Sequence, residues 1–180
     1  TCTKHHCLAI VNAGSSGSRA YIYSYDLDKT NTPIHINKLW GHTINPGIST
    51  IEHQPQAVFS YLDKLFAKMP RPHINVYFYA TAGMRLLSQK DNEDTYALIK
   101  KWFMAHHRWN LVEARTISGE EEGLYTWLAA NYAVHRFEEN KPLIAVIDIG
   151  GGSTQISIPV QKDKKMIQKT PNVHSFILYG

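Results

Sequence analysis

The sequence is poor in cysteine and contains no long hydrophobic run. Its two cysteines, Cys2 and Cys7, both lie at the amino end, where they can pair with each other, pair outside this chain or stay unpaired. Histidines stand between them, but the spacing matches no zinc motif. No run of about 18 apolar residues occurs, so we expect no membrane segment in these residues. An Asn-x-Ser/Thr acceptor for glycosylation is also missing.

The sequence also lacks a basic track. Its net charge is +4, but the lysines are scattered and are not interleaved with aromatic residues, which argues against nucleic acid as a partner. A mild positive charge still helps to attract a substrate that carries phosphate. Hydrophobic residues make up 43% of the 180 residues, which is enough for a buried core.

The hydrophobic patterns predict three strands, then helices and strands in alternation, then a second hairpin. The predicted strands are 7–12, 19–26, 34–40, 74–80, 111–117, 143–149 and 155–160, and the predicted helices are 56–69, 94–106 and 118–136. We expect strand 74–80 to be buried on both faces. On the third helix, we expect Tyr125, Trp127 and Tyr132 to lie in the core.

This order is that of an α/β protein with a ribonuclease-H-like, actin-type lobe, β-β-β-α-β-α-β-α, followed by the first strands of a second such lobe. We expect the first lobe at residues 1–138 and the start of the second at residues 139–180.

Two turns between predicted strands are rich in glycine and serine. The first is NAGSSGSR, residues 12–19, and the second is DIGGGSTQ, residues 148–155. Small residues let the backbone approach a phosphate, and successive N–H groups can point into the anion. In the second turn, Asp148 at the end of a strand suits a carboxylate that holds a hydrated divalent cation. Two such turns predict two lobes that face each other across a phosphate.

Two further motifs carry polar groups. In SGEEEGLYTW, residues 118–127, Ser118 and Glu121 stand in capping-box register. Glu120 and Glu122 then either favour the helix dipole or activate a water molecule. In YATAGMRLL, residues 79–87, Thr81 follows a strand at the end where open α/β sheets bind ligands, although a plain strand-to-helix connection explains it too.

The motifs AGSSGSR, ATAGMRLL, ISGEEEGLYTW and DIGGGSTQI resemble, in order and spacing, the first four conserved regions of the ecto-nucleoside triphosphate diphosphohydrolases, or apyrases. The tail VHSFILYG, residues 173–180, resembles a further segment of that family, and bacterial secreted members are the most similar in style. The resemblance implies a secreted or extracellular enzyme that removes phosphates from nucleoside tri- and diphosphates. It also implies Ca²⁺ or Mg²⁺ and in-line attack by water.

The resemblance also implies a role for single residues. Glu122 matches the general base, Ser153 and Gln155 match residues that hold the attacking water, and Thr81 matches a threonine near the metal's water shell. Asp148 matches one of two aspartates that hold the metal through waters. The positions that match phosphate-binding residues are Ser15, Ser16, Gly17, Gly151, Gly152 and Ser153.

The sequence departs from the family pattern at two points. Asn12 stands where the family has its other metal aspartate, which predicts weaker metal binding and reduced turnover, and leaves a non-catalytic nucleotide-binding relative as an alternative. An exopolyphosphatase-like phosphatase is another, although the helix motif that ends at Trp127 argues against it. The family's second lobe also continues well beyond residue 180. We therefore expect its remainder as a partner, on a separate chain or as a cleavage product.

Overall fold

The computed structural model describes residues 2, 4–51, 54–70, 73–137, 141–162, 166–167 and 171–177. The chain forms two compact units, unit 1 at Thr1–Thr116 and unit 2 at Ile117–Gly180. The compact units thus divide before the third predicted helix, whereas the sequence prediction placed the lobe boundary after it, at residue 138. The physical reason is that this helix packs on the strands that follow it.

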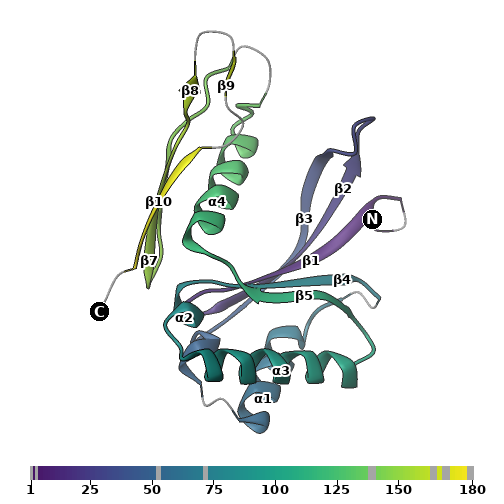
Figure 1. The fold of residues 1–180 in the computed structure, drawn as a ribbon. Coiled ribbons are helices and arrows are strands. Elements are labelled where there is room, and N and C mark those ends of the chain that lie inside the picture. The colour runs from purple at the N-terminus through teal and green to yellow at the C-terminus, as the bar shows by residue number, and fades with distance from the viewer. Residues whose placement is uncertain are drawn as a thin grey trace. The chain divides into compact units, whose positions relative to one another are not determined.

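Unit 1 is built on a mixed five-stranded sheet in the order β3-β2-β1-β4-β5 (Figure 1). The first three strands are antiparallel neighbours, and β4 and β5 continue the sheet in parallel with β1. The strands are β1 (His6–Ala13), β2 (Ser18–Leu27), β3 (Pro33–Ile44), β4 (Asn75–Ala80) and β5 (Asn110–Thr116). Along the chain, these strands and the two long helices between them follow the predicted order β-β-β-α-β-α-β.

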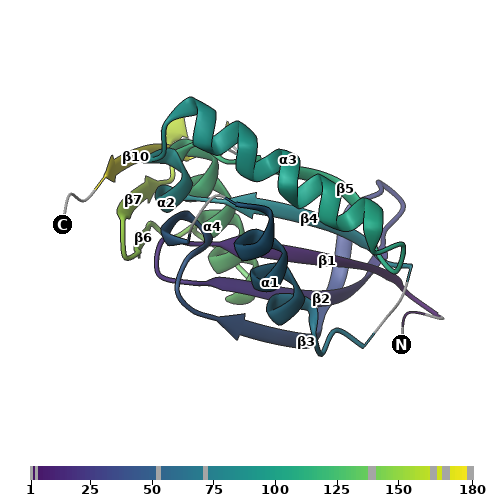
Figure 2. The ribbon, with the colours of Figure 1, turned by 90° about the horizontal axis from the view of Figure 1, so that it is seen from below.

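Helices α1 (Pro55–Phe66) and α3 (Gln89–Ala105) cover one face of this sheet, as Figure 2 shows. Apolar residues of β1 and β4, such as Val11 and Phe78, are fully buried there together with Leu62 and Trp102 of the helices. Helix α3 begins before the predicted residue 94 because Ser88 caps it, accepting a hydrogen bond from the Asp91 amide.

Smaller elements of unit 1 were not predicted. A one-turn 3₁₀ helix, η1 (Ile48–Thr50), precedes α1, and the short helix α2 (Ala82–Arg85) follows β4. Helix α1 ends at Phe66, ahead of Pro70. The prediction that strand 74–80 is buried on both faces was wrong, because its tyrosines lie half-buried on the face away from α1 and α3, as in Tyr77 and Tyr79. Cys2 and Cys7 form a disulfide.

Unit 2 consists of a three-stranded antiparallel sheet and one helix that packs on it. The sheet has the order β10-β7-β6, and the helix is α4 (Gly119–Ala133). The strands are β6 (Val146–Ile149), β7 (Ser153–Ile158) and β10 (Asn172–Ile177), with a separate pair, β8 (Gln161–Lys162) and β9 (Met166–Ile167). Residues 178–180 of the tail motif lie outside the described residues. No described helix combines the length and the apolar character that crossing a membrane requires.

Helix α4 lies close to its sheet because two of its glycines face it. A Cβ atom on Gly123 would lie 3.0 Å from Ser157 Oγ, and one on Gly119 would collide with Ser175 Oγ. The predicted capping box of Ser118 and Glu121 is present. Trp127 is fully buried, as predicted, but the prediction for Tyr125 and Tyr132 was wrong, since both are exposed. The buried residues of α4, Gly119, Gly123, Trp127 and Asn131, form a narrow stripe along the helix.

Candidate active site

The first glycine hairpin, residues 12–19, connects β1 to β2. The Gly14 N–H donates to the Gly17 carbonyl oxygen at 2.9 Å, which closes the turn. Asn12 is the sheet partner of Arg19, one residue pair away from the turn, and its side chain is exposed. The backbone of Ser15 and Ser16 therefore forms the tip of the turn.

The second glycine hairpin, residues 148–155, repeats this geometry in unit 2. The Gly150 N–H donates to the Ser153 carbonyl oxygen, again at 2.9 Å. Asp148 is the sheet partner of Gln155, as Asn12 is of Arg19. The two hairpins thus match residue by residue: Asn12 corresponds to Asp148 and Gly17 to Ser153. The two turns that resemble each other in sequence therefore also have the same backbone structure.

Thr81 stands beside the first glycine hairpin. Its N–H donates to the Ala13 carbonyl oxygen at 3.1 Å, which continues the pairing of β4 with β1 past the end of the strand. Thr81 is buried, and the following residues approach the turn so closely that a Cβ on Gly83 would lie 3.0 Å from the Ser15 Cα. The structure therefore brings together Asn12, Ser15 and Thr81, as expected for groups at the carboxyl ends of neighbouring parallel strands.

In unit 2, helix α4 presents two side chains to the second glycine hairpin. Glu122 and Thr126 are four residues apart and so lie on the same side of the helix. The Ser153 hydroxyl donates to Glu122 Oε2 at 3.5 Å. The Thr126 hydroxyl donates to Asp148 Oδ2 at 2.8 Å. One turn of helix thus contacts both strands of the hairpin.

The hydrogen bonds continue from Ser153 into the sheet. The Gln155 amide nitrogen donates to Ser153 Oγ at 2.9 Å and to Ser175 Oγ at 3.2 Å. Ser153 and Gln155 are almost fully buried, so these bonds are shielded from competing water. Because Ser153 Oγ accepts from the amide, its own hydrogen is available to the Glu122 carboxylate. This arrangement suits a carboxylate that accepts a proton from water.

Sequence reasoning missed two residues of this network. Thr126 lies within the helix motif, and its spacing of four from Glu122 was a signal that placed both on one side of α4. Ser175 gave no local signal, because its contact with Gln155 depends on the pairing of β10 with β7. Strand pairing over such a separation is not encoded in the short pattern around either residue.

Each glycine hairpin has oxygen-bearing side chains on it or beside it, Asn12 and Thr81 in unit 1 and Asp148 in unit 2. Asp148 offers a carboxylate, Asn12 an amide oxygen and Thr81 a hydroxyl, and oxygen donors are the ligands of Ca²⁺ and Mg²⁺. Within the described part of the chain, no group of three His, Cys, Asp or Glu side chains is arranged to bind a metal directly.

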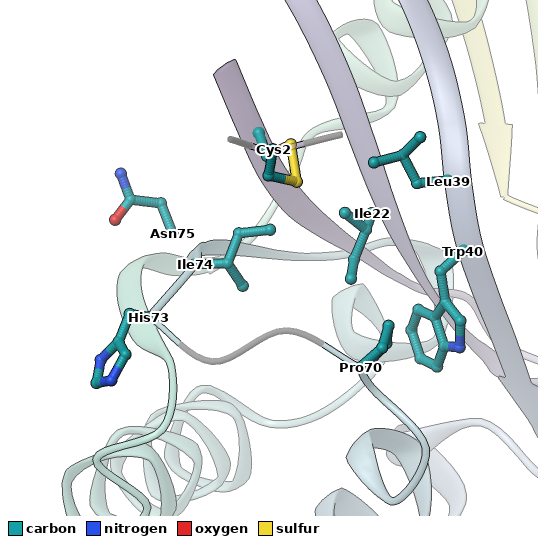
Figure 3. Close-up of a pocket in the computed structure, with 9 residues that line it drawn as sticks. Cys2, Ile22, Leu39, Trp40, Pro70, His73, Ile74 and Asn75 are labelled. Carbon is teal, nitrogen blue, oxygen red and sulfur yellow. A yellow bond between two sulfur atoms is a disulfide. The ribbon is translucent and has the colours of Figure 1, made fainter. Parts of the chain in front are cut away.

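A depression of about 610 Å³ lies elsewhere on unit 1. Figure 3 shows that it is lined by Cys2 of the disulfide, by Ile22, Leu39 and Trp40, and by His73 and Ile74. None of the predicted site residues lines it. The chemistry-bearing groups belong instead to the two glycine hairpins and to Thr81 and α4.

The sheet order of unit 1 and the repeated hairpin in unit 2 define an actin-like fold. The solved structure described as nucleoside triphosphate hydrolases from Neospora caninum has the same fold, with a TM-score of 0.59 at 16% identity, over 95% of this chain and 44% of that chain. The model of the GDA1/CD39 (nucleoside phosphatase) family matches residues 1–178. The chain therefore belongs to the GDA1/CD39 family.

Two relatives with curated names are similar in sequence. The nucleoside-triphosphatase ntp-1 of Caenorhabditis elegans is 32% identical over 171 residues, which cover 87% of this chain and 32% of the relative. The Golgi apyrase of Saccharomyces cerevisiae is 34% identical over 182 residues, which cover 82% of this chain and 29% of the relative. This chain thus spans about a third of the length of these relatives.

Proposed function

We propose that this protein hydrolyses nucleoside triphosphates and diphosphates to monophosphates. The two glycine hairpins bind phosphate groups through their backbone N–H groups and serine hydroxyls. Glu122 is the general base that activates water, and Ser153 and Gln155 hold that water. Thr81 lies near the water shell of the metal. The family match and the names of the relatives support the reaction class.

One observation carries the proposal: the contact of Ser153 with Glu122 at 3.5 Å. It joins the second glycine hairpin to a carboxylate on α4, so that a phosphate-binding turn and a base meet within one unit. A phosphoryl group bound by residues 150–153 would lie beside a carboxylate able to accept a proton. Positioning and charge neutralisation account for most of the catalysis in phosphoryl transfer, and general base catalysis adds about 10²- to 10⁴-fold.

The residues present suggest how Ca²⁺ or Mg²⁺ takes part. When bound, the cation neutralises phosphate charge. We propose that Asp148 holds it through waters and that Thr126 fixes the orientation of that carboxylate. Asn12 offers the same shape as an aspartate without the charge, so metal affinity and turnover are lower than an Asp at this position would give.

Phosphate release by the full-length protein tests this function. ATP and ADP are supplied with Ca²⁺ or Mg²⁺, and the Asn12→Asp variant is measured beside the parent. We expect release by the parent and about 10- to 100-fold faster release by Asn12→Asp. Glu122→Gln in either background should remove release while leaving the unfolding transition unchanged. No release from any nucleotide by Asn12→Asp would refute the hydrolase.

Asn12 favours one alternative, a nucleotide-binding relative without turnover. That protein would bind ADP with Mg²⁺ in calorimetry and release no phosphate in the parent form. Polyphosphate, added as a third substrate, separates both readings from an exopolyphosphatase-like enzyme, because only the last would prefer it.

We further propose that more polypeptide of the second lobe covers the sheet of unit 2, as a separate chain, a cleavage product or a continuation of this one. The sheet face away from α4 exposes Ile149 by 75%, Ile147 by 63% and Phe176 by 52%, and apolar patches of this kind mark contact surfaces. The matched relatives are about three times as long, and the residues that they have beyond the matched part are the kind of polypeptide that we propose here. The Cys2–Cys7 disulfide supports a secreted or extracellular protein.

A further inference from the structure

Residues 45–47 pack against the first glycine hairpin. Gly47 has φ −66° and ψ 149°, a conformation open to any residue. A Cβ on this glycine would nevertheless lie 2.6 Å from the Gly14 carbonyl oxygen and would collide with that of Ser15. Glycine is therefore required here by space and not by backbone angle, and the space it leaves is filled by the backbone of the hairpin.

The same segment supports the other side of the turn. A Cβ on Gly17 would lie 2.7 Å from the Ile44 carbonyl oxygen and would collide with the Asn45 side chain. With its nitrogen turned toward acceptors, the Asn45 amide donates to the Ser16 carbonyl oxygen at 2.9 Å and to the Ile44 carbonyl oxygen at 3.2 Å. The tip of the hairpin is thus held through its carbonyl groups, which leaves its N–H groups for an anion.

Tyr61 of α1 ties this segment to the end of the hairpin. Its hydroxyl donates to the Pro46 carbonyl oxygen at 2.9 Å and lies 2.8 Å from Ser18 Oγ, a second hydrogen-bond partner. Tyr61 is only 6% exposed and Ser18 is fully buried. Burial also raises the pKa of Tyr61 above its usual value of 10.0. Helix α1 is packed in the core of unit 1, so it supplies a rigid anchor.

We propose that residues 45–47 and Tyr61 are positioning residues for the first glycine hairpin, holding its N–H groups in place for phosphate. They do not touch the substrate in this proposal, and their role rests on the proposed function of the hairpin. A loop that is fixed before binding loses less conformational entropy when the anion binds. The support therefore acts on phosphate affinity.

The test compares three variants of the full-length protein with the parent. Gly47→Ala inserts a methyl group against the hairpin backbone, and Tyr61→Phe removes one hydroxyl at constant shape. Gly41→Ala is the matched control, because its Cβ would meet the Tyr21 ring carbons at 2.7 and 2.8 Å and not the hairpin. Hydrogen exchange followed by mass spectrometry reports on peptides that cover residues 13–19. Calorimetry with pyrophosphate, and KM and kcat for ADP, report on binding.

We expect exchange in residues 13–19 to rise by about tenfold in Gly47→Ala and by about threefold to tenfold in Tyr61→Phe. The affinity for pyrophosphate should fall and the KM for ADP should rise by similar factors, with kcat changed less. Gly41→Ala should match the parent in exchange of residues 13–19, in pyrophosphate affinity and in KM for ADP. Unchanged exchange in both hairpin variants would overturn the proposal, and so would a loss of kcat with unchanged KM and affinity.

The two proposals fail in different ways. If exchange rises as expected but the parent binds neither pyrophosphate nor ADP, the support for the hairpin stands as a structural fact. The phosphate-binding function of the hairpin, and with it the positioning role, is then refuted. If Gly47→Ala does not fold, Tyr61→Phe decides alone, because that change leaves the packing of α1 intact.

Discussion

The two glycine hairpins share one backbone turn but are supported by different neighbours. Both are closed by an N–H···O bond of 2.9 Å at the same position. In the first hairpin, that position holds Gly17, which is backed by Ile44 and Asn45. In the second it holds Ser153, whose hydroxyl meets Glu122 of α4. The same position in the turn thus packs against residues 44 and 45 in one unit and carries a hydroxyl that meets a helix carboxylate in the other.

The comparison shows what decides whether such a turn can present a side-chain hydroxyl to its neighbours. A turn backed by neighbouring backbone has no space for a side chain and can offer only N–H groups and tip hydroxyls. A turn that faces a helix can carry a hydroxyl toward that helix. The residues that pack against each hairpin, and not its glycine content, therefore determine which groups the hairpin can offer.

The strongest way to break the comparison is to exchange the two equivalent residues. Gly17→Ser places a side chain against the Asn45 amide and the Ile44 carbonyl oxygen, so we expect a loss of about 3 kcal/mol in the free energy of unfolding. Ser153→Gly causes no collision but removes buried hydrogen bonds, so it should cost less, about 1 to 2 kcal/mol. Urea unfolding of both variants measures the difference. Equal losses would contradict the different support of the two turns.

Removing only the hydroxyl of Ser153 addresses its role in chemistry. Ser153→Ala takes away the hydrogen bond to Glu122 and the acceptor for Gln155, and we expect kcat for ADP to fall about a hundredfold. Ser16→Ala, at the exposed tip of the first hairpin, should raise KM with a smaller change in kcat. Steady-state kinetics of the two variants checks this contrast. A larger kcat loss in Ser16→Ala would reverse the assigned roles.

Ser175 sharpens the comparison, because it is the sheet partner of Gln155 as Thr43 is of Arg19 beside the first hairpin. Ser175→Ala removes one partner of the Gln155 amide, and we expect about a tenfold loss in kcat. Ser157→Ala is the matched control: it is a buried serine of β7 whose hydroxyl donates to the Gly123 carbonyl oxygen at 2.9 Å. Removing the Ser157 hydroxyl should lower the free energy of unfolding and leave kcat unchanged.

The smallest expected effect concerns unit 1 at high pH. Burial raises the pKa of Tyr96 to about 12 from 10.0, although its hydrogen bond with Thr116 opposes the shift. The folded state therefore favours the protonated form, and this stabilisation is complete below pH 10 and disappears as the pH rises toward 12. Tyr96→Phe should lose less stability than the parent between these pH values. Denaturant titrations at several pH values provide the measurement.

Much of the fold was predictable from short patterns. The alternation of Tyr21, Ile22 and Tyr23 predicted β2, and Ser118 with Glu121 predicted the start of α4, because strand period and helix caps are local properties. Helix α3 was predicted to start too late, since Ser88 caps it ahead of the first periodic apolar residues. Tyr125 and Tyr132 were misplaced because an aromatic residue on an amphipathic helix does not reveal how wide the buried side is.

The candidate site was predictable only in part. The resemblance placed Glu122, Ser153 and Gln155, and the structure joins these three through hydrogen bonds. The shared cleft between two lobes and the roles of Asn12 and Asp148 stay predictions. Ser175 and residues 45–47 were missed because their contacts link segments that are far apart along the chain, and no local pattern encodes such contacts.

The four-residue interval between Glu122 and Thr126 sets a limit on how this site can vary. One helical turn forms hydrogen bonds with the Ser153 hydroxyl on β7 and with the Asp148 carboxylate on β6 at the same time. An insertion or deletion of a single residue between them would rotate one side chain by about 100° around the helix axis. Length changes within that turn should therefore be excluded.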